Sequence, residues 1–148
     1  MDVELREITR ETVRAVCALR VADGQRDFVA ENALSIAQAH FDPRHWMSAI
    51  YADGELAGFV LTIEDADRGT YYLWRFMVDA DFQRRGVGRR AMNLLLERWR
   101  ALGATDAKLS VVDDNHAAVA LYETVGFQST GEYVNGELVM SARLALTP

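Results

Sequence analysis

Hydrophobic residues follow two different periods along the chain, and each change of period marks a change of element. Residues 71–78 form an apolar, aromatic run of strand length. Residues 87–102 follow with apolar side chains at three- and four-residue spacing, and Gly103 comes next. The first pattern is typical of a β-strand, and the second of an amphipathic helix closed by glycine.

The N-terminal half predicts a strand, two helical segments and a hairpin. Thr9 can cap the first helical segment, and Asp42-Pro43 breaks the second. Asp53-Gly54 between two apolar runs is a strong hairpin signal. The expected ranges are 3–8 for the strand, 9–24 and 28–40 for the helical segments, and 49–51 and 56–61 for the hairpin strands.

The C-terminal half predicts a strand, a helix and a second hairpin. Asn115 can cap the helix, Gly126 can close it, and Asn135-Gly136 forms the hairpin turn. The expected ranges are 107–112, 117–125, 127–134 and 138–144.

The predicted order of elements is β-α-α-β-β-β-α-β-α-β-β. Hairpins pair antiparallel strands, whereas the strand–helix–strand unit over residues 71–112 requires a parallel pair. The sequence therefore predicts an α/β (α+β) fold, with a mixed sheet of about seven strands and four helices on its faces.

Composition narrows the class of protein. The 148 residues suit one domain over 1–148, because no repeat or linker divides them. A net charge of −6 argues against a nucleic-acid binder, and the single Cys17 cannot form an internal disulfide. The acidic start Met1-Asp2-Val3-Glu4 does not resemble a signal peptide, and no run approaches the ~20 apolar residues that cross a bilayer. We expect a cytoplasmic protein without a membrane partner.

The candidate chemistry lies where the aromatic strand meets the long helix, at residues 83–88, Gln-Arg-Arg-Gly-Val-Gly. Unpaired N–H groups of a first helical turn bind anions, and glycines let a ligand approach the backbone. A phosphate or pyrophosphate is the expected ligand. The turn lacks the Lys-Ser/Thr of a nucleotide P-loop, and it does not stand in the first βα unit, as a dinucleotide-binding turn would.

Two motifs resemble those of the GNAT family of N-acetyltransferases. Gln83, Gly86 and Gly88 match Gln/Arg-x-x-Gly-x-Gly/Ala between the fourth strand and third helix. The second motif is an Asn after the fifth strand, then Ala-x-x-Leu-Tyr-x-x-x-Gly-Phe, and here it comprises Asn115, Ala118, Leu121, Tyr122, Gly126 and Phe127. The resemblance covers nearly the whole chain, and it implies the family fold and acetyl-CoA as cosubstrate, with no metal.

The resemblance also implies roles for individual residues. Backbone N–H groups of residues 84–88 would hold the pyrophosphate, and the arginines could reach the 3′-phosphate. One N–H group, at Phe76 or Met77, would polarise the thioester carbonyl. Tyr122 would protonate the leaving thiolate. The residues expected at the cofactor are Phe76, Met77, Val78, Gln83, Arg84, Arg85, Gly86, Val87, Gly88, Arg89, Asn115, Ala118 and Tyr122.

The acceptor amine must lose a proton before it attacks, and family members usually use a Glu or Asp for this step. The carboxylates that could serve are Glu64 with its neighbour Asp65, Glu31 and Glu132, although a side chain in such a position is more often a solvated carboxylate than a base. Tyr72 and Trp74 could form walls of the acceptor channel, with Arg75 on the opposite face of the strand.

A narrower resemblance is to bacterial diamine and polyamine (spermine/spermidine) acetyltransferases. It rests on residues 74–79, 109–111, 131–132 and 135–137. The expected acceptor is therefore a primary amine of a polyamine or a similar small cation. An aminoglycoside-type antibiotic, a protein N-terminus and a coenzyme A sensor without turnover stay open as alternatives. The resemblance also allows a homodimer formed through the late hairpin.

Overall fold

A single mixed sheet of seven strands forms the centre of the computed structural model, which describes residues 1–28 and 30–144. The strands lie in the order β1-β2-β3-β4-β5-β7-β6. Neighbours pair antiparallel except β4 and β5, which are parallel. The strands are β1 Val3–Arg6, β2 His45–Ala52, β3 Glu55–Asp65, β4 Thr70–Val78, β5 Asp106–Val111, β6 Gln128–Val134 and β7 Glu137–Arg143. The predicted fold class and order of elements are confirmed.

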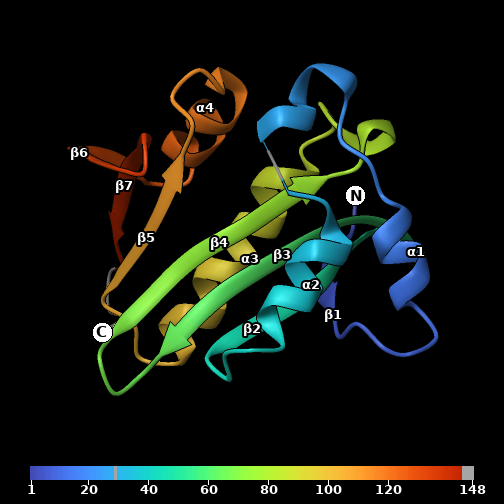
Figure 1. The fold of residues 1–148 in the computed structure, drawn as a ribbon, viewed down its shortest axis with the longest axis horizontal. Coiled ribbons are helices and arrows are strands. Elements are labelled where there is room, and N and C mark those ends of the chain that lie inside the picture. The colour runs from blue at the N-terminus through green and yellow to red at the C-terminus, as the bar shows by residue number, and fades with distance from the viewer. Residues whose placement is uncertain (29, 145–148) are drawn as a thin grey trace.

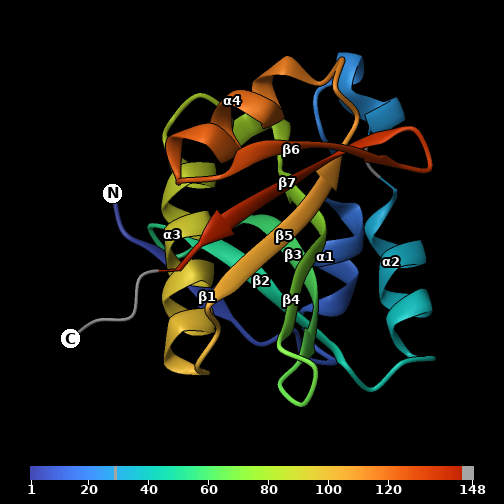
Figure 2. The same ribbon diagram turned by 90° about the vertical axis from the view of Figure 1, so that its left-hand side faces the viewer.

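Helices cover both faces of the sheet, with α1 and α2 on one face and α3 on the other (Figure 1 and Figure 2). Their bounds are α1 Val13–Ala18, α2 Asn32–Ala39, α3 Val87–Ala101 and α4 His116–Thr124, with short 3-10 turns η1 Asp23–Phe28 and η2 Ala80–Phe82. In the described part of the chain, no helix has the length and apolarity that a membrane crossing requires.

The two N-terminal helices are shorter than the sequence predicts, and after α1 tertiary hydrogen bonds replace helical ones. The backbone becomes extended at Leu19, where α1 ends. The next residue, Arg20, donates its N–H group to the Asp79 carboxylate at 3.0 Å and accepts the Ala80 N–H at 2.8 Å. These bonds fasten the segment after α1 to the end of β4.

Alternating side chains of the strands bury a hydrophobic core on each face of the sheet. On one face, Leu73 and Leu109 pack with Trp99 of α3. On the other face, Phe59 and Leu61 pack with Val16 of α1. The core thus holds the strands between the two helical layers.

The parallel strands β4 and β5 separate soon after they pair. Their register joins Tyr72 to Lys108 and Leu73 to Leu109, whereas β4 continues to Val78 beside β3. The β3–β4 register shifts at Leu61/Thr62, where a bulge makes Trp74 the extra residue of β4. Bulges redirect side chains and are frequent beside functional sites. The separation opens the sheet at the end of β4 that leads into residues 83–88.

Candidate active site

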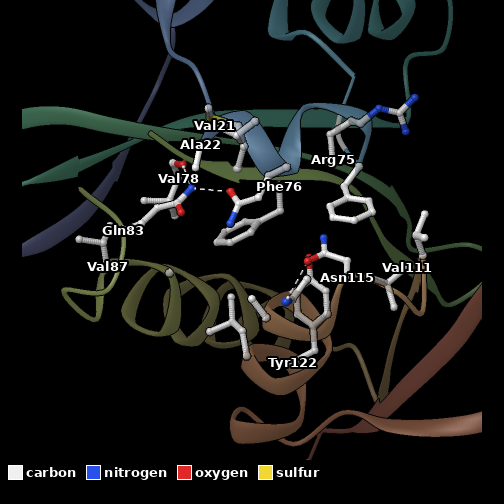
Figure 3. Close-up of a pocket in the computed structure, with 18 of the residues that line it drawn as sticks. Val21, Ala22, Arg75, Phe76, Val78, Gln83, Val87, Val111, Asn115 and Tyr122 are labelled. Carbon is white, nitrogen blue, oxygen red and sulfur yellow. Dashed lines mark hydrogen bonds between the residues drawn. The ribbon is translucent and has the colours of Figure 1, made fainter. Parts of the chain in front are cut away.

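A cavity of about 970 Å³ lies where β4 and β5 separate. We call it the β4–β5 cleft (Figure 3). It is lined by residues 74–78, by residues 83–89 without Arg85, by the end of β5, by α4 with Asn115, by the β6–β7 turn with Glu137, and by Val21, Ala22, Gln25, Phe28, Ala80 and Phe82. A cavity of this size suits a small-molecule ligand of considerable length.

The segment between β4 and α3 is held by side-chain hydrogen bonds. The Asp79 carboxylate accepts the Asp81 N–H at 3.1 Å. The Gln83 amide nitrogen Nε2 donates to the Val78 carbonyl at 2.9 Å and to Oε1 of Gln25 in η1 at 2.8 Å. The loop therefore has a fixed conformation, and it is joined to the segment that follows α1.

The backbone conformation of this loop suits an anion. Arg84 and Gly86 have φ values of 62° and 82°, in the left-handed region, and α3 begins directly after Gly86. Successive N–H groups in such a turn form a concave site for an anion, and the helix dipole adds a favourable partial charge. Arg84 and Arg89 also line the cleft.

Gly88 allows three elements to meet closely at this wall of the cleft. A Cβ atom on Gly88 would lie 3.2 Å from Cδ2 of Leu121 in α4 and 3.6 Å from Cγ2 of Val78 in β4. Since Leu121 and Val78 themselves line the cleft, a larger residue here would crowd its floor.

Helix α4 supplies two polar side chains. Oδ1 of Asn115 accepts the Ala118 N–H at 3.3 Å, which confirms the predicted N-cap and leaves the amide nitrogen pointing toward β4 (Figure 3). Tyr122 is 7% exposed and packs edge-on to Phe127 at 6.1 Å between ring centroids. Burial raises the pKa of the Tyr122 phenol above its ordinary value, so the hydroxyl keeps its proton at neutral pH. It can therefore act as a proton donor.

The cleft brings together every residue expected at the cofactor except Arg85. The guanidinium of Arg85 lies over the Phe82 ring instead, 5.1 Å from its centroid. The residues that line the cleft as expected are Phe76, Met77, Val78, Gln83, Arg84, Gly86, Val87, Gly88, Arg89, Asn115, Ala118 and Tyr122.

The structure places Glu64 outside the cleft. Its carboxylate accepts hydrogen bonds from Arg98 at 2.8 and 3.0 Å and from Trp99 Nε1 at 2.7 Å, so it holds β3 to α3. Glu64 pairs with Tyr71, at the end of β4 that lies away from residues 83–88. Both observations argue against the expected role of Glu64 as general base, and Asp65 beside it is in contact with Arg44 at 3.6 Å.

The other two candidate carboxylates also lie outside the lining of the cleft. Glu31 is exposed and precedes α2, where it lines a smaller cavity of about 180 Å³. That cavity shares Val21 and Met77 with the cleft. Glu132 is exposed on β6 and is not among the lining residues.

The bulge in β4 corrects the expected orientation of Arg75. Arg75 lies opposite Leu61, whose face of the sheet also carries Trp74, and its guanidinium is 4.3 Å from the Trp74 ring centroid. Both side chains line the cleft, whereas Tyr72 is bonded to Ser110 and is not in the lining. Strand alternation alone had placed Arg75 on the opposite face.

Sequence reasoning missed several lining residues, among them Gln25, Phe28 and Glu137. Gln25 and Phe28 come from η1, for which the chain carries no local signal. Glu137 is the first residue of β7, directly after the turn residues Asn135-Gly136, and that turn was the available signal.

The family assignment agrees with this geometry. The sequence model of the acetyltransferase (GNAT) family matches residues 8–127, most of the chain. The chain belongs to the GNAT family. The spermine/spermidine N(1)-acetyltransferase of Bacillus subtilis (strain 168) is 27% identical over 152 residues, which cover 97% of this chain and 100% of that protein.

Other GNAT proteins are similar over part of the chain or in fold. The ribosomal protein bS18-alanine N-acetyltransferase of Salmonella typhimurium is 41% identical over 76 residues, 51% of this chain and 50% of that protein. The structure of spermidine N-acetyltransferase from Vibrio cholerae with CoA and spermine has a TM-score of 0.76 at 22% identity, covering 96% of this chain and 95% of that one. At that identity the likeness concerns the fold.

GNAT enzymes use acetyl-CoA, and the cleft fits this cosubstrate. The left-handed turn at residues 84 and 86 offers an anion site at one end. The unpaired edge of β4 and the Asn115 amide offer hydrogen bonds along its length. Within the described residues, no group of three or more His, Cys, Asp or Glu side chains is arranged to hold a metal ion.

Proposed function

We propose that this GNAT enzyme transfers the acetyl group of acetyl-CoA to a primary amine of a polyamine or similar small cation. The observation that carries the transfer is the shared cleft, which joins the anion-binding loop to the buried Tyr122. The acceptor class is supported by the full-length likeness to the Bacillus subtilis spermine/spermidine N(1)-acetyltransferase.

Several groups that line the cleft have distinct roles in the proposed transfer. Acetyl-CoA supplies an acyl group activated as a thioester. The N–H groups of residues 84–88, together with the side chains of Arg84 and Arg89, bind the phosphate groups of acetyl-CoA. An N–H group of Phe76 or Met77 stabilises the oxyanion that develops on the thioester carbonyl. The acceptor ammonium loses two protons as its nitrogen forms the amide bond. Tyr122 gives one proton to the sulfur as the carbon–sulfur bond breaks, and it then regains a proton from solvent.

The test is a thiol-release assay with acetyl-CoA and spermidine. The wild-type protein should release thiol, and Tyr122→Phe should lower kcat about 100-fold, the scale of general acid catalysis, with acetyl-CoA affinity within about twofold. Absence of thiol release with any polyamine at any pH would make the proposed acceptor wrong. An unchanged kcat for Tyr122→Phe would make the proposed proton donor wrong.

A protein N-terminus is the second candidate acceptor, favoured by the 41% identity to the bS18-alanine N-acetyltransferase over half the chain. The same assay with a peptide whose N-terminus is alanine distinguishes it from spermidine. An aminoglycoside belongs in the same panel. A coenzyme A sensor would bind acetyl-CoA and release no thiol from it with any acceptor, and Tyr122→Phe would leave its affinity for acetyl-CoA unchanged.

Three further expectations stay predictions from the sequence. They are the single domain over residues 1–148, residence in the cytoplasm without nucleic-acid or membrane partners, and the homodimer.

A further inference from the structure

Glu137 is the only acidic side chain among the described residues that line the β4–β5 cleft. The other charged groups in this lining are Arg75, Arg84 and Arg89. Arg84 belongs to residues 83–88, the segment expected to hold the pyrophosphate, and Arg89 lies in the first turn of α3. The acceptor side of the cleft therefore contains one negative group, Glu137, and one positive group, Arg75.

The β6–β7 turn fixes the position of Glu137. Asn135 and Gly136 have φ values of 51° and 79°, as in the two-residue turns that join twisted strands. Glu137 pairs with Val134 across this turn, so its backbone is held in the hairpin. A group that must receive a substrate benefits from such a rigid support.

The register of β7 determines which face of the sheet Glu137 occupies. Leu138 pairs with Val111, and both side chains pack on the α3 side of the sheet. Successive side chains of a strand point to opposite faces, so Glu137 faces the side covered by α1 and α2. It lies just beyond the last residue of β5, beside the opening between β4 and β5.

Arg75 faces the same side from β4. Its Nη1 donates to the Trp74 carbonyl at 3.1 Å, and its Nε is buried without a hydrogen-bond partner in the described structure. Burial lowers the pKa of the Arg75 guanidinium, and the charge of Glu137 acts in the opposite direction. The two charges thus influence each other across the cleft, although no ion pair joins them in the described residues.

We propose that Glu137 is the carboxylate that binds the acceptor ammonium and takes a proton from it. This inference rests on the proposed function, and in it Glu137 takes the role of general base that the sequence suggested for Glu64, Glu31 or Glu132. The proton passes from nitrogen to a Glu137 oxygen, which leaves a neutral amine and a carboxylic acid that returns the proton to solvent. The positive charge of Arg75 directs an ammonium toward Glu137, because like charges in a partly buried cavity repel.

The test compares Glu137→Gln with Glu132→Gln. Both substitutions remove one negative charge from the same hairpin, but Glu132 is exposed and lies outside the cleft. Glu137→Gln should lower kcat/KM for spermidine by about 100-fold, the scale of general base catalysis, with the KM for acetyl-CoA within about twofold. Glu132→Gln should stay within about twofold of the wild type, and Glu137→Asp should recover part of the loss.

Calorimetric binding of spermidine to the CoA-saturated protein separates this inference from the proposed function. Binding at least tenfold weaker in Glu137→Gln than in wild type supports the role of Glu137, even if the wild type releases no thiol and the proposed function fails. The inference is overturned if the wild type does not bind spermidine, or if Glu137→Gln binds and acetylates it like the wild type. Equal losses of affinity for acetyl-CoA and spermidine would also overturn it, because they indicate a structural role.

Discussion

At the residue scale, Tyr122 combines a buried ring with a place in the wall of the cleft. Removing water from the phenol disfavours its ionised form, which raises its pKa above the ordinary value of 10.0. A group that must donate a proton at neutral pH needs this protonated state. Burial therefore supports the same role that the family motif implies.

The pH profile of the enzyme should show this effect. Because the folded pKa is raised, Tyr122 should cause no loss of kcat/KM below about pH 10, the ordinary pKa of tyrosine. Above that pH, the unfolded chain loses this proton before the folded protein does, so the contribution of Tyr122 to stability should fall. Steady-state rates from pH 6 to 10 for wild type and Tyr122→Phe check the first statement. A descending limb near pH 8 that the variant lacks would contradict it.

Most residues expected at the cofactor could be selected from the sequence and do line the cleft, whereas the places of Arg75 and Glu137 in it could not be predicted. Gln83, Gly86 and Tyr122 belong to short motifs whose local spacing is visible in the sequence. The direction of Arg75 depends on a bulge, and that of Glu137 on the register between β5 and β7. The bulge and the register both depend on how the strands pair, and this pairing could not be predicted from a single sequence.

At the element scale, the turn into α3 depends on one left-handed glycine. Gly86 has a φ of 82°, and it immediately precedes the helix. An L-residue in this region costs about 1–2 kcal/mol. Gly88 is the second residue of α3, and a Cβ added there would contact the flexible end of the Leu121 side chain.

Alanine substitutions should distinguish these two glycines. Gly86→Ala should lower the free energy of unfolding by about 1–2 kcal/mol, because the strain has no compensation. Gly88→Ala should change it by less than about 1 kcal/mol, since the better helix propensity of alanine offsets the contact with Leu121. Urea denaturation of the ligand-free proteins measures both values. Equal losses would show that the turn conformation is not the source of the effect.

The long helix α3 was predicted well, because its apolar period continues regularly over several turns, whereas the strands β2 and β3 are longer than the expected ranges 49–51 and 56–61. The 15 residues of α3 follow the expected helix over 87–102 within one residue. The helix predicted for the segment after α1 was wrong, because the backbone of this segment forms hydrogen bonds with Asp79 and Ala80, which are distant in the sequence. Local pattern cannot anticipate a partner of this kind.

At the scale of the whole molecule, one end of the β3–β4 pair contributes to the cleft and the other end contributes to stability. The cleft lies at one end, and the contacts of Glu64 with Arg98 and Trp99 lie at the other. The Glu64 side chain is only 12% exposed. Removing its charge would leave Arg98 without its partner but would not alter the cleft.

Glu64→Gln should therefore affect stability and not turnover. The free energy of unfolding should fall by about 1–3 kcal/mol, the usual loss for a buried charged hydrogen bond. The value of kcat should stay within about twofold of the wild type. Denaturation and thiol-release assays on one preparation give both values. A fall of about 100-fold in kcat, typical of a lost general base, would restore Glu64 as a catalytic candidate.

The separation of β4 from β5 also has a consequence for how the substrate preference of this protein can evolve. In the proposed function, main-chain N–H groups of residues 84–88 hold the phosphates of the donor, and most substitutions leave such groups in place. The proposed acceptor side instead depends on individual side chains that line the cleft, among them Trp74, Arg75 and Glu137. A single replacement there can alter which amine is accepted while the donor stays the same. The fold therefore allows new acceptor preferences to arise without rebuilding the chemistry of acetyl transfer.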